Sequence, residues 1–149
     1  MERNKSQTKI TLKVPEYLSD DQRLDVGIAV LQFINDRTRE GKNVYGRSWG
    51  GAAAKYSEQY AKKKGVPVSG PVDLALTSEM LGKMQYFKSL SKKGELVIGF
   101  KEGTKAQKKA EGNILGSYGR DPNPKKARPF LDILKKDLDS IISEVTGDS

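Results

Sequence analysis

The chain has 149 residues, 27 Lys and Arg, 19 Asp and Glu, and a formal net charge of +8, which fits one domain and favours anionic partners. It contains no Cys and no His, so disulfides, thiolate or His-based catalysis, and Cys- or His-ligated metal sites are excluded. It has no apolar run near the ~18 residues of a membrane helix, and it begins without the apolar core of a signal peptide. We therefore expect a soluble protein made in a cytoplasm, without membrane contact.

A strand and a long helix are predicted to begin the fold. Polar and apolar residues alternate over residues 8–14, the period of a half-buried strand, and residues 1–7 are expected to be frayed. Ser19 and Gln22 have the spacing of a capping box, which predicts a helix that ends near Gly41. Its expected apolar face consists of Leu24, Ile28, Leu31 and Ile34. The first half of this segment also alternates in polarity, so a strand is the competing interpretation.

The middle of the chain is predicted to contain a loop and two further helices. Residues 42–52 are rich in Gly and contain Trp49, which is interpreted as a core anchor or an interface residue. A short helix is expected over residues 53–65. Apolar residues at helical spacing indicate another helix within residues 74–87, capped by a Thr or Ser.

A hairpin and a long loop are predicted to follow. Residues 86–91 and 95–100 are expected to be the two strands of the hairpin, joined by a short Lys-Lys-Gly turn. Gly, Pro and Lys dominate residues 101–127, which indicates a long mobile loop of the kind that carries function. Residues 106–112 have the composition for one or two helical turns within it.

An amphipathic helix is predicted to end the chain. Pro129 holds Arg128 out of helical geometry and suits the first turn of a helix, so the helix is expected to begin there, with residues 146–149 frayed. Its apolar stripe starts at Phe130 and continues through Leu131, Leu134, Leu138, Ile141, Ile142 and Val145. Phe130 and Leu131 are expected to anchor the loop to the helix, with Arg128 beside them.

Together these elements predict an α+β fold in a single domain over residues 1–149. Strands near residues 8–14, 86–91 and 95–100 are expected to form a small, mostly antiparallel sheet, against which three or four helices pack. The first and last helices are expected to supply most of the helical core. A long basic loop that contains Gly and Pro precedes the last helix.

Positive charge is concentrated in one part of the chain. Residues 92–128 contain ten basic and four acidic residues, a net charge of +6, whereas residues 132–149 carry a net charge of −3. This reversal suits a head-to-tail contact between copies of the chain, and a solvated loop that keeps the protein in solution explains it equally well. The residues expected to contact a partner or DNA are Lys105, Lys108, Lys109, Arg120, Lys125 and Lys126.

No catalytic, cofactor-binding or metal site is predicted, and enzymatic activity is not expected. The sequence contains no glycine-rich phosphate loop. Its carboxylate pairs, Asp20 with Asp21 and Asp137 with Asp139, are explained by helix capping and by the polar face of the last helix. Basic and aromatic residues are interleaved over residues 45–64, which makes sequence-nonspecific nucleic-acid binding one candidate function.

Several segments resemble the virion-morphogenesis proteins of tailed phages, which include small tail-completion and head–tail joining subunits. In that family an Ala/Pro-Arg-Pro-Phe-Leu segment opens the C-terminal helix, as ARPFLDIL does from Ala127. WGGAAAKYSEQYAKKKG, from Trp49, and LALTSEMLGKM, from Leu74, resemble the family's aromatic helix and the Leu-Thr/Ser-Gly segment after it. A hairpin ending in LVIGF extends the likeness, which spans Trp49 to Val145. Glu79 departs from it, because the family commonly has Gly there.

The resemblance implies a non-catalytic structural subunit of a bacteriophage virion, without cofactors. It implies a homo-oligomeric ring, a hexamer by expectation, at the head–tail junction, assembled in the host cytoplasm as a tail-completion, tail-terminator or neck protein. The expected neighbours are connector and tail-tube or tail-terminator proteins, together with nonspecific contact with packaged DNA. The residues expected at the assembly interface are Trp49, Arg128, Pro129, Phe130 and Leu131.

Overall fold

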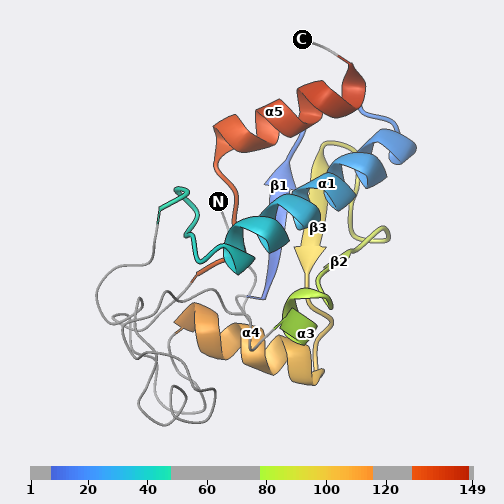
Figure 1. Ribbon diagram of the computed structural model, residues 1–149. Helices are drawn as coiled ribbons and strands as arrows, with labels where there is room; N and C mark the ends of the chain where they lie inside the picture. The colour runs from blue at the N-terminus through green and yellow to red at the C-terminus, as the bar shows by residue number, and fades with distance from the viewer. Residues whose placement is uncertain (1–7, 48–77, 116–128, 148–149) are drawn as a thin grey trace, which may run out of the picture.

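The computed structural model of the chain describes residues 8–47, 78–115 and 129–147. Its elements, in chain order, are β1 (Lys9–Lys13), α1 (Asp20–Arg39), α3 (Ser78–Leu81), β2 (Gln85–Tyr86), β3 (Glu95–Gly99), α4 (Lys105–Leu115) and α5 (Lys135–Thr146) (Figure 1). They form a small three-stranded antiparallel sheet with helices packed on it, which confirms the predicted α+β class.

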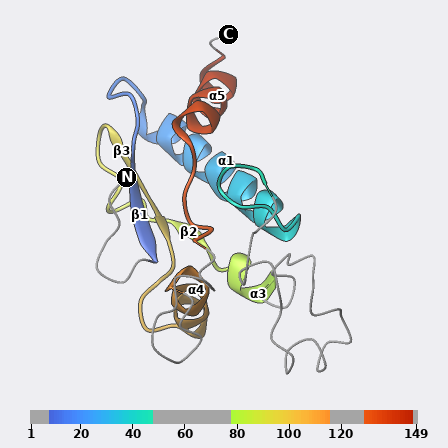
Figure 2. The ribbon, with the colours of Figure 1, turned by 90° about the vertical axis from the view of Figure 1, so that its left-hand side faces the viewer.

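β3 lies at the centre of the sheet, between β1 and β2. Both neighbours run antiparallel to it, and in the longer pairing Ile10 lies opposite Ile98 and Leu12 opposite Leu96. These four side chains are at most 1 % exposed, because alternate residues of a strand point to the same face and α1 covers that face (Figure 2). The alternation in the sequence of β1 and the continuous apolar run in β3 thus produce the inner layer of the core.

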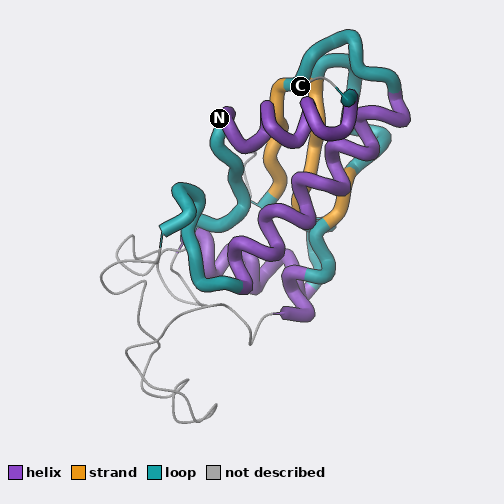
Figure 3. Tube along the Cα trace, turned by 45° about the horizontal axis from the view of Figure 1, so that its top comes forward, coloured by secondary structure: helices purple, strands orange, loops and turns teal. Residues whose placement is uncertain are grey.

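α1 is a helix of 20 residues that lies across the sheet, with α5 packed beside it (Figure 3). The Ser19 hydroxyl accepts a hydrogen bond from the Gln22 backbone N–H at 3.1 Å, and the Gln22 side chain accepts one from the Ser19 N–H at 3.0 Å. The predicted capping box is therefore confirmed, and the competing strand interpretation is wrong. Gly41, at φ 77°, ends the helix as expected.

The buried face of α1 differs from the predicted one. Val26, Val30 and Ile34 are fully buried, whereas Leu24 and Ile28 are 37 % and 55 % exposed. Residues two positions apart on a helix point to nearly opposite sides, so the row that contains Val26 packs on the sheet and the row that contains Leu24 faces outward. The predicted apolar face is therefore wrong for Leu24 and Ile28.

Gly27 allows α1 to lie directly on the side chain of Tyr86 in β2. A Cβ atom at this position would lie only 2.5 Å from the Tyr86 Cδ1 atom. The absence of a side chain at Gly27 therefore sets how closely the helix approaches this edge of the sheet.

The helix predicted within residues 74–87 is much shorter than expected. α3 ends at Leu81, after which the Met84 N–H donates to the Leu81 carbonyl at 3.3 Å and the chain enters β2. Residues 74–77 lie outside the described part of the chain. The apolar residues after Leu81 therefore serve a turn and a strand instead of a continuing helix.

The predicted hairpin is antiparallel, but its first strand is short. After β2 the chain turns at Phe87, whose carbonyl accepts hydrogen bonds from the N–H groups of Leu90 and Ser91 at 3.1 and 3.0 Å. The Ser91 hydroxyl then accepts a hydrogen bond from the Val97 N–H at 2.9 Å, in the place of a strand partner. The strand prediction over residues 86–91 is wrong beyond Tyr86, because side-chain and turn hydrogen bonds replace the ladder there.

α4 occupies residues 105–115, where the sequence predicts a mobile loop. Thr104 caps the helix, since its hydroxyl accepts a hydrogen bond from the Gln107 N–H at 3.1 Å, and Ala110 and Ile114 are buried in the core. The helical turns expected over residues 106–112 are thus part of a longer helix, and the loop prediction is wrong for residues 105 and 113–115, because a face of small and apolar side chains packs at the end of the sheet. The rest of the predicted loop, residues 116–127, lies outside the described part of the chain.

The C-terminal helix begins later than predicted. Residues 129–134 are not helical, and α5 begins at Lys135. Phe130 and Leu131 are fully buried, and the Phe130 ring meets Phe100 edge-to-face at a centroid distance of 6.2 Å. Since both side chains reach the core from an extended segment, the proline does not stand in the first turn of α5.

The rest of the C-terminal prediction agrees with α5. The expected apolar stripe is buried at Leu138, Ile141 and Ile142. The prediction that fraying begins at residue 146 is wrong for Thr146, which is still helical, and the helix ends at Gly147 with φ 77°. The termini at residues 1–7 and 148–149 lie outside the described part of the chain.

Candidate interaction surfaces

α4 gathers three of the predicted contact residues on one exposed surface. Lys105, Lys108 and Lys109 lie at helical spacing and are exposed, on the side of α4 away from the buried Ala110 and Ile114. We call these three residues the α4 lysine face. None of them forms an ion pair among the described residues, so their charges are free to meet a partner.

The other predicted site residues divide between the core and the parts of the chain that are not described. Phe130 and Leu131 are fully buried, so they anchor their segment to the core and do not face a neighbouring copy. Pro129 is half-buried. Trp49, Arg120, Lys125, Lys126 and Arg128 lie outside the described residues.

The outward side of α1 forms a second exposed surface, which was not predicted as a site. Asp21, Leu24, Asp25 and Ile28 follow the i, i+3, i+4, i+7 spacing of one helix face, and all four are exposed. We call them the α1 outer face. The sequence shows two apolar rows on α1, one through Leu24 and one through Val26, and both cannot face one core. It does not show which of the two rows faces outward.

Arg37 joins the end of α1 to the segment that leads into α5. Its Nη2 group donates hydrogen bonds to the Phe130 carbonyl at 2.6 Å and the Asp132 carbonyl at 3.1 Å, and only 6 % of the residue is exposed. Burial lowers the pKa of Arg37 from its usual value to about 10, against the opposing attraction of the carboxylates of Asp132 and Asp137. The sequence suggests only a basic helix end here, so this structural role was missed.

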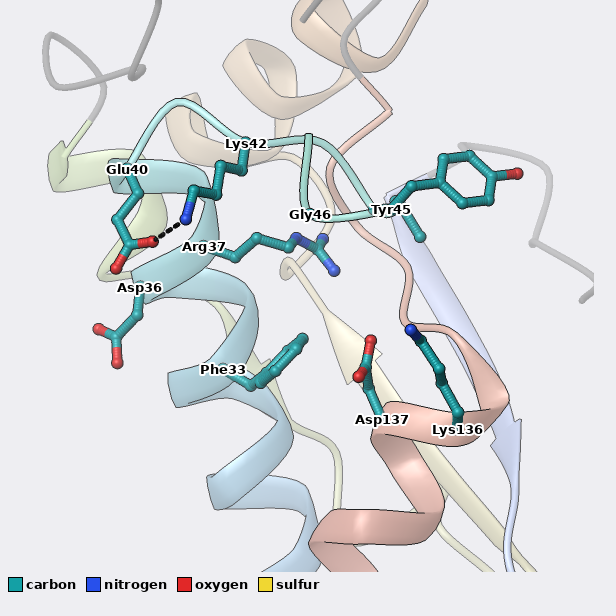
Figure 4. Close-up of a pocket in the computed structure, with 10 residues that line it drawn as sticks. Phe33, Asp36, Arg37, Glu40, Lys42, Tyr45, Gly46, Lys136 and Asp137 are labelled. Carbon is teal, nitrogen blue, oxygen red and sulfur yellow. Dashed lines mark ion pairs between the residues drawn. The ribbon is translucent and has the colours of Figure 1, made fainter. Parts of the chain in front are cut away.

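A cleft of about 360 Å³ lies between the end of α1, the loop after it and the start of α5 (Figure 4). Arg37 extends into this region, and the Asp137 carboxylate points toward it. The ionisable side chains that line the cleft include Asp36, Arg37, Glu40, Lys42, Lys136 and Asp137. Cations and anions are thus balanced, and Glu40 already pairs with Lys42 at 3.2 Å. This charge balance favours neither an anionic nor a cationic ligand.

Within residues 8–47, 78–115 and 129–147, no group of three or more acidic residues is arranged to hold a metal ion. No helix in the same part of the chain is long and apolar enough to cross a membrane. No family model, curated protein or solved structure matches the chain.

Proposed function

We propose that the chain is a structural subunit that assembles with copies of itself into a ring at the head–tail interface of a tailed-phage virion. In this role it acts as a tail-completion, tail-terminator or neck protein, with connector and tail-tube proteins as neighbours. The observation that carries the proposal is the separation of charge between two elements, with exposed lysines gathered on α4 and exposed aspartates on the outward side of α1.

The basic and the acidic surfaces lie on different elements. α4, with its lysine face, lies at one end of the sheet, whereas α5 and the first turn of α1 lie toward the other (Figures 1 and 2). Residues 129–147 contain four acidic and two basic residues, and the first turn of α1 adds Asp20 and Asp21. A contact between two different surfaces of identical subunits is head-to-tail, and it closes into a ring when the rotation between neighbours allows.

The phage context rests on the sequence resemblance, above all on the Arg-Pro-Phe-Leu segment. The positions of Phe130 and Leu131 support a packing role for this part of the segment, since both side chains fix the chain to the core immediately before α5. The packing of Phe130 and Leu131 in the core leaves α4 and the outer side of α1 exposed. Both surfaces are therefore available for contacts between subunits in a ring.

The assembly proposal is tested by reversing the charges of the α4 lysine face. We expect the full chain to form a discrete oligomer in light scattering and rings in negative-stain images, and the triple variant Lys105→Glu, Lys108→Glu, Lys109→Glu to remain monomeric. The matched control is Lys88→Glu, Lys92→Glu, Lys93→Glu, which makes the same charge change at three exposed residues between β2 and β3. This control should assemble as the unmodified chain does.

The same variants separate assembly from the alternative, sequence-nonspecific nucleic-acid binding. The α4 lysine face favours that alternative, since free lysines on one helix face neutralise phosphates, and such binding weakens steeply with salt. If the full chain stays monomeric at every concentration yet shifts DNA in gels, and only the α4 variant loses the shift, the structural proposal is overturned. Assembly of the α4 variant would also overturn it.

A further inference from the structure

α1 carries apolar residues on two opposite sides. Its inner row, Val26, Val30 and Ile34, is fully buried, while Leu24 and Ile28 on the outer face are 37 % and 55 % exposed. A helix that is apolar on both sides is typical of one that is packed on both sides. The outer face of α1 therefore offers an apolar surface that no described residue of this chain covers.

We propose that the α1 outer face binds the α4 lysine face of a second copy of this chain. This inference rests on the proposed assembly function and names the two surfaces that meet in it. It makes the contact heterologous, because each copy gives one surface and receives the other.

The charges of the two surfaces favour α4 as the helix that covers the α1 outer face. Asp21 and Asp25 lie one turn apart on the outer face, exposed and without an ion pair among the described residues. Lys105 and Lys109 have the same spacing on α4, so both pairs are separated by about 6 Å along their helix axes. Two helices laid side by side can therefore bring both lysines to both aspartates.

The same contact covers the apolar residues. A lysine side chain has a four-carbon stem that packs on apolar surface while its ammonium group stays at the edge. With the ammonium groups of α4 on Asp21 and Asp25, the lysine stems lie over Leu24 between the two aspartates, and Ile28 lies at the edge of the contact, less than one turn beyond Asp25. Both features of the outer face, its acids and its aliphatic side chains, are thus used by one partner helix.

Charge also disfavours the symmetric alternative, in which two α1 helices pair with each other. The exposed side of α1 carries the carboxylates of Asp21, Asp25 and Asp36 and one cation, Arg39. Acidic residues therefore outnumber the basic one, so pairing two such faces brings mainly like charges together, and close like charges oppose association. The two surfaces lie in different places on the subunit, since α1 lies across the sheet and α4 lies at its end (Figures 1 and 2). A contact between them therefore rotates each subunit relative to the next, as a ring requires.

The absence of Cys from the chain permits a direct test by disulfide cross-linking. One preparation carries Leu24→Cys and another carries Lys108→Cys, because residue 108 lies opposite residue 24 when Lys105 and Lys109 meet Asp21 and Asp25 in parallel register. The two preparations are mixed and mildly oxidised. We expect a cross-linked dimer that contains one copy of each variant, and a ladder of multimers from a chain that carries both substitutions. Leu90→Cys, at a residue that is 45 % exposed between β2 and β3, replaces Leu24→Cys in the control mixture and should give no dimer with Lys108→Cys.

A charge exchange provides a readout that does not depend on cysteine. One preparation carries the double substitution Asp21→Lys, Asp25→Lys, and another carries Lys105→Glu, Lys109→Glu. Neither double variant should assemble on its own. Mixing the two should restore an oligomer of alternating copies, because each contact again joins opposite charges.

Each outcome bears on the inference separately from the proposed function. An oligomer in light scattering that lacks the cross-link between residues 24 and 108 leaves the assembly function intact and overturns this interface. Dimers from the Leu24→Cys preparation alone would show the symmetric α1 contact and overturn it as well. A full chain that is monomeric throughout would overturn both proposals.

Discussion

Arg37 is a buried cation held mainly by backbone carbonyls. The two carbonyls that accept from its guanidinium, those of Phe130 and Asp132, belong to the segment before α5. Nε and Nη1 are buried without a hydrogen-bond partner in the described residues, which agrees with a pKa lowered by burial to about 10. The guanidinium stays charged at neutral pH, so its burial costs solvation free energy at that pH. The role of Arg37 is therefore to position the segment before α5.

Removing this side chain should loosen the junction of α1 and α5. We expect Arg37→Ala to lower the free energy of unfolding by about 1–3 kcal/mol, since the Phe130 and Asp132 carbonyls each lose a charged hydrogen-bond donor. Arg39→Ala, at an exposed residue two positions away, should change it by less than about 0.5 kcal/mol. Urea unfolding measures both, and equal effects of the two substitutions would contradict the structural role of Arg37.

At the scale of elements, α1 packs so closely on β2 that a methyl group added at Gly27 would have two opposing effects on stability. Alanine in place of Gly27 favours the helix by about 1 kcal/mol, but its Cβ would lie 2.5 Å from the Tyr86 ring, and overpacking of this kind costs about 1–3 kcal/mol. We therefore expect Gly27→Ala to destabilise the protein in thermal or urea unfolding.

The control for this prediction removes the ring. In a Tyr86→Ala background the overlap is gone, so Gly27→Ala should become neutral or stabilising, by up to about 1 kcal/mol. A double-mutant cycle isolates this coupling. If Gly27→Ala had the same sign in both backgrounds, the close approach of α1 to Tyr86 would be contradicted.

Elements whose signals are local were predictable from the sequence, and those that depend on tertiary contacts were not. The capping box at Ser19 and the alternation of β1 involve neighbouring residues only, and both are confirmed. The start of α5 depends on Phe130 reaching Phe100, 30 residues earlier in the chain. No local pattern reports that contact, so proline geometry alone placed the helix start too early.

α4 illustrates the same limit. Its sequence has many lysines and a glycine, and its only strong local signals are the Thr104 cap and two alanines. The Gln107 amide also donates to the Thr8 hydroxyl at 3.3 Å, a contact with the residue before β1. The lysines chosen from the sequence are therefore grouped by a helix that the sequence analysis did not predict beyond one or two turns.

For the whole molecule, the α1 outer face could not be identified from sequence because both rows of α1 are apolar. Only the packing on the sheet decides that Val26 faces inward and Leu24 outward. The interface inferred from that choice has two components with different responses to salt. The ion pairs of Asp21 and Asp25 with the lysines are screened, whereas the contact of Leu24 and Ile28 with the lysine stems is not.

The balance between these components predicts how assembly responds to salt. Raising NaCl from 0.1 M to 1 M shortens the screening length from about 10 Å to about 3 Å, so the oligomer should dissociate progressively in light scattering. Sulfate at the same ionic strength should dissociate it less, because sulfate strengthens apolar burial while it screens charge. Ile28→Ser should weaken assembly in both salts and reduce the advantage of sulfate. An oligomer that is indifferent to NaCl would contradict the charged component, and equal dissociation by the two salts would contradict the apolar one.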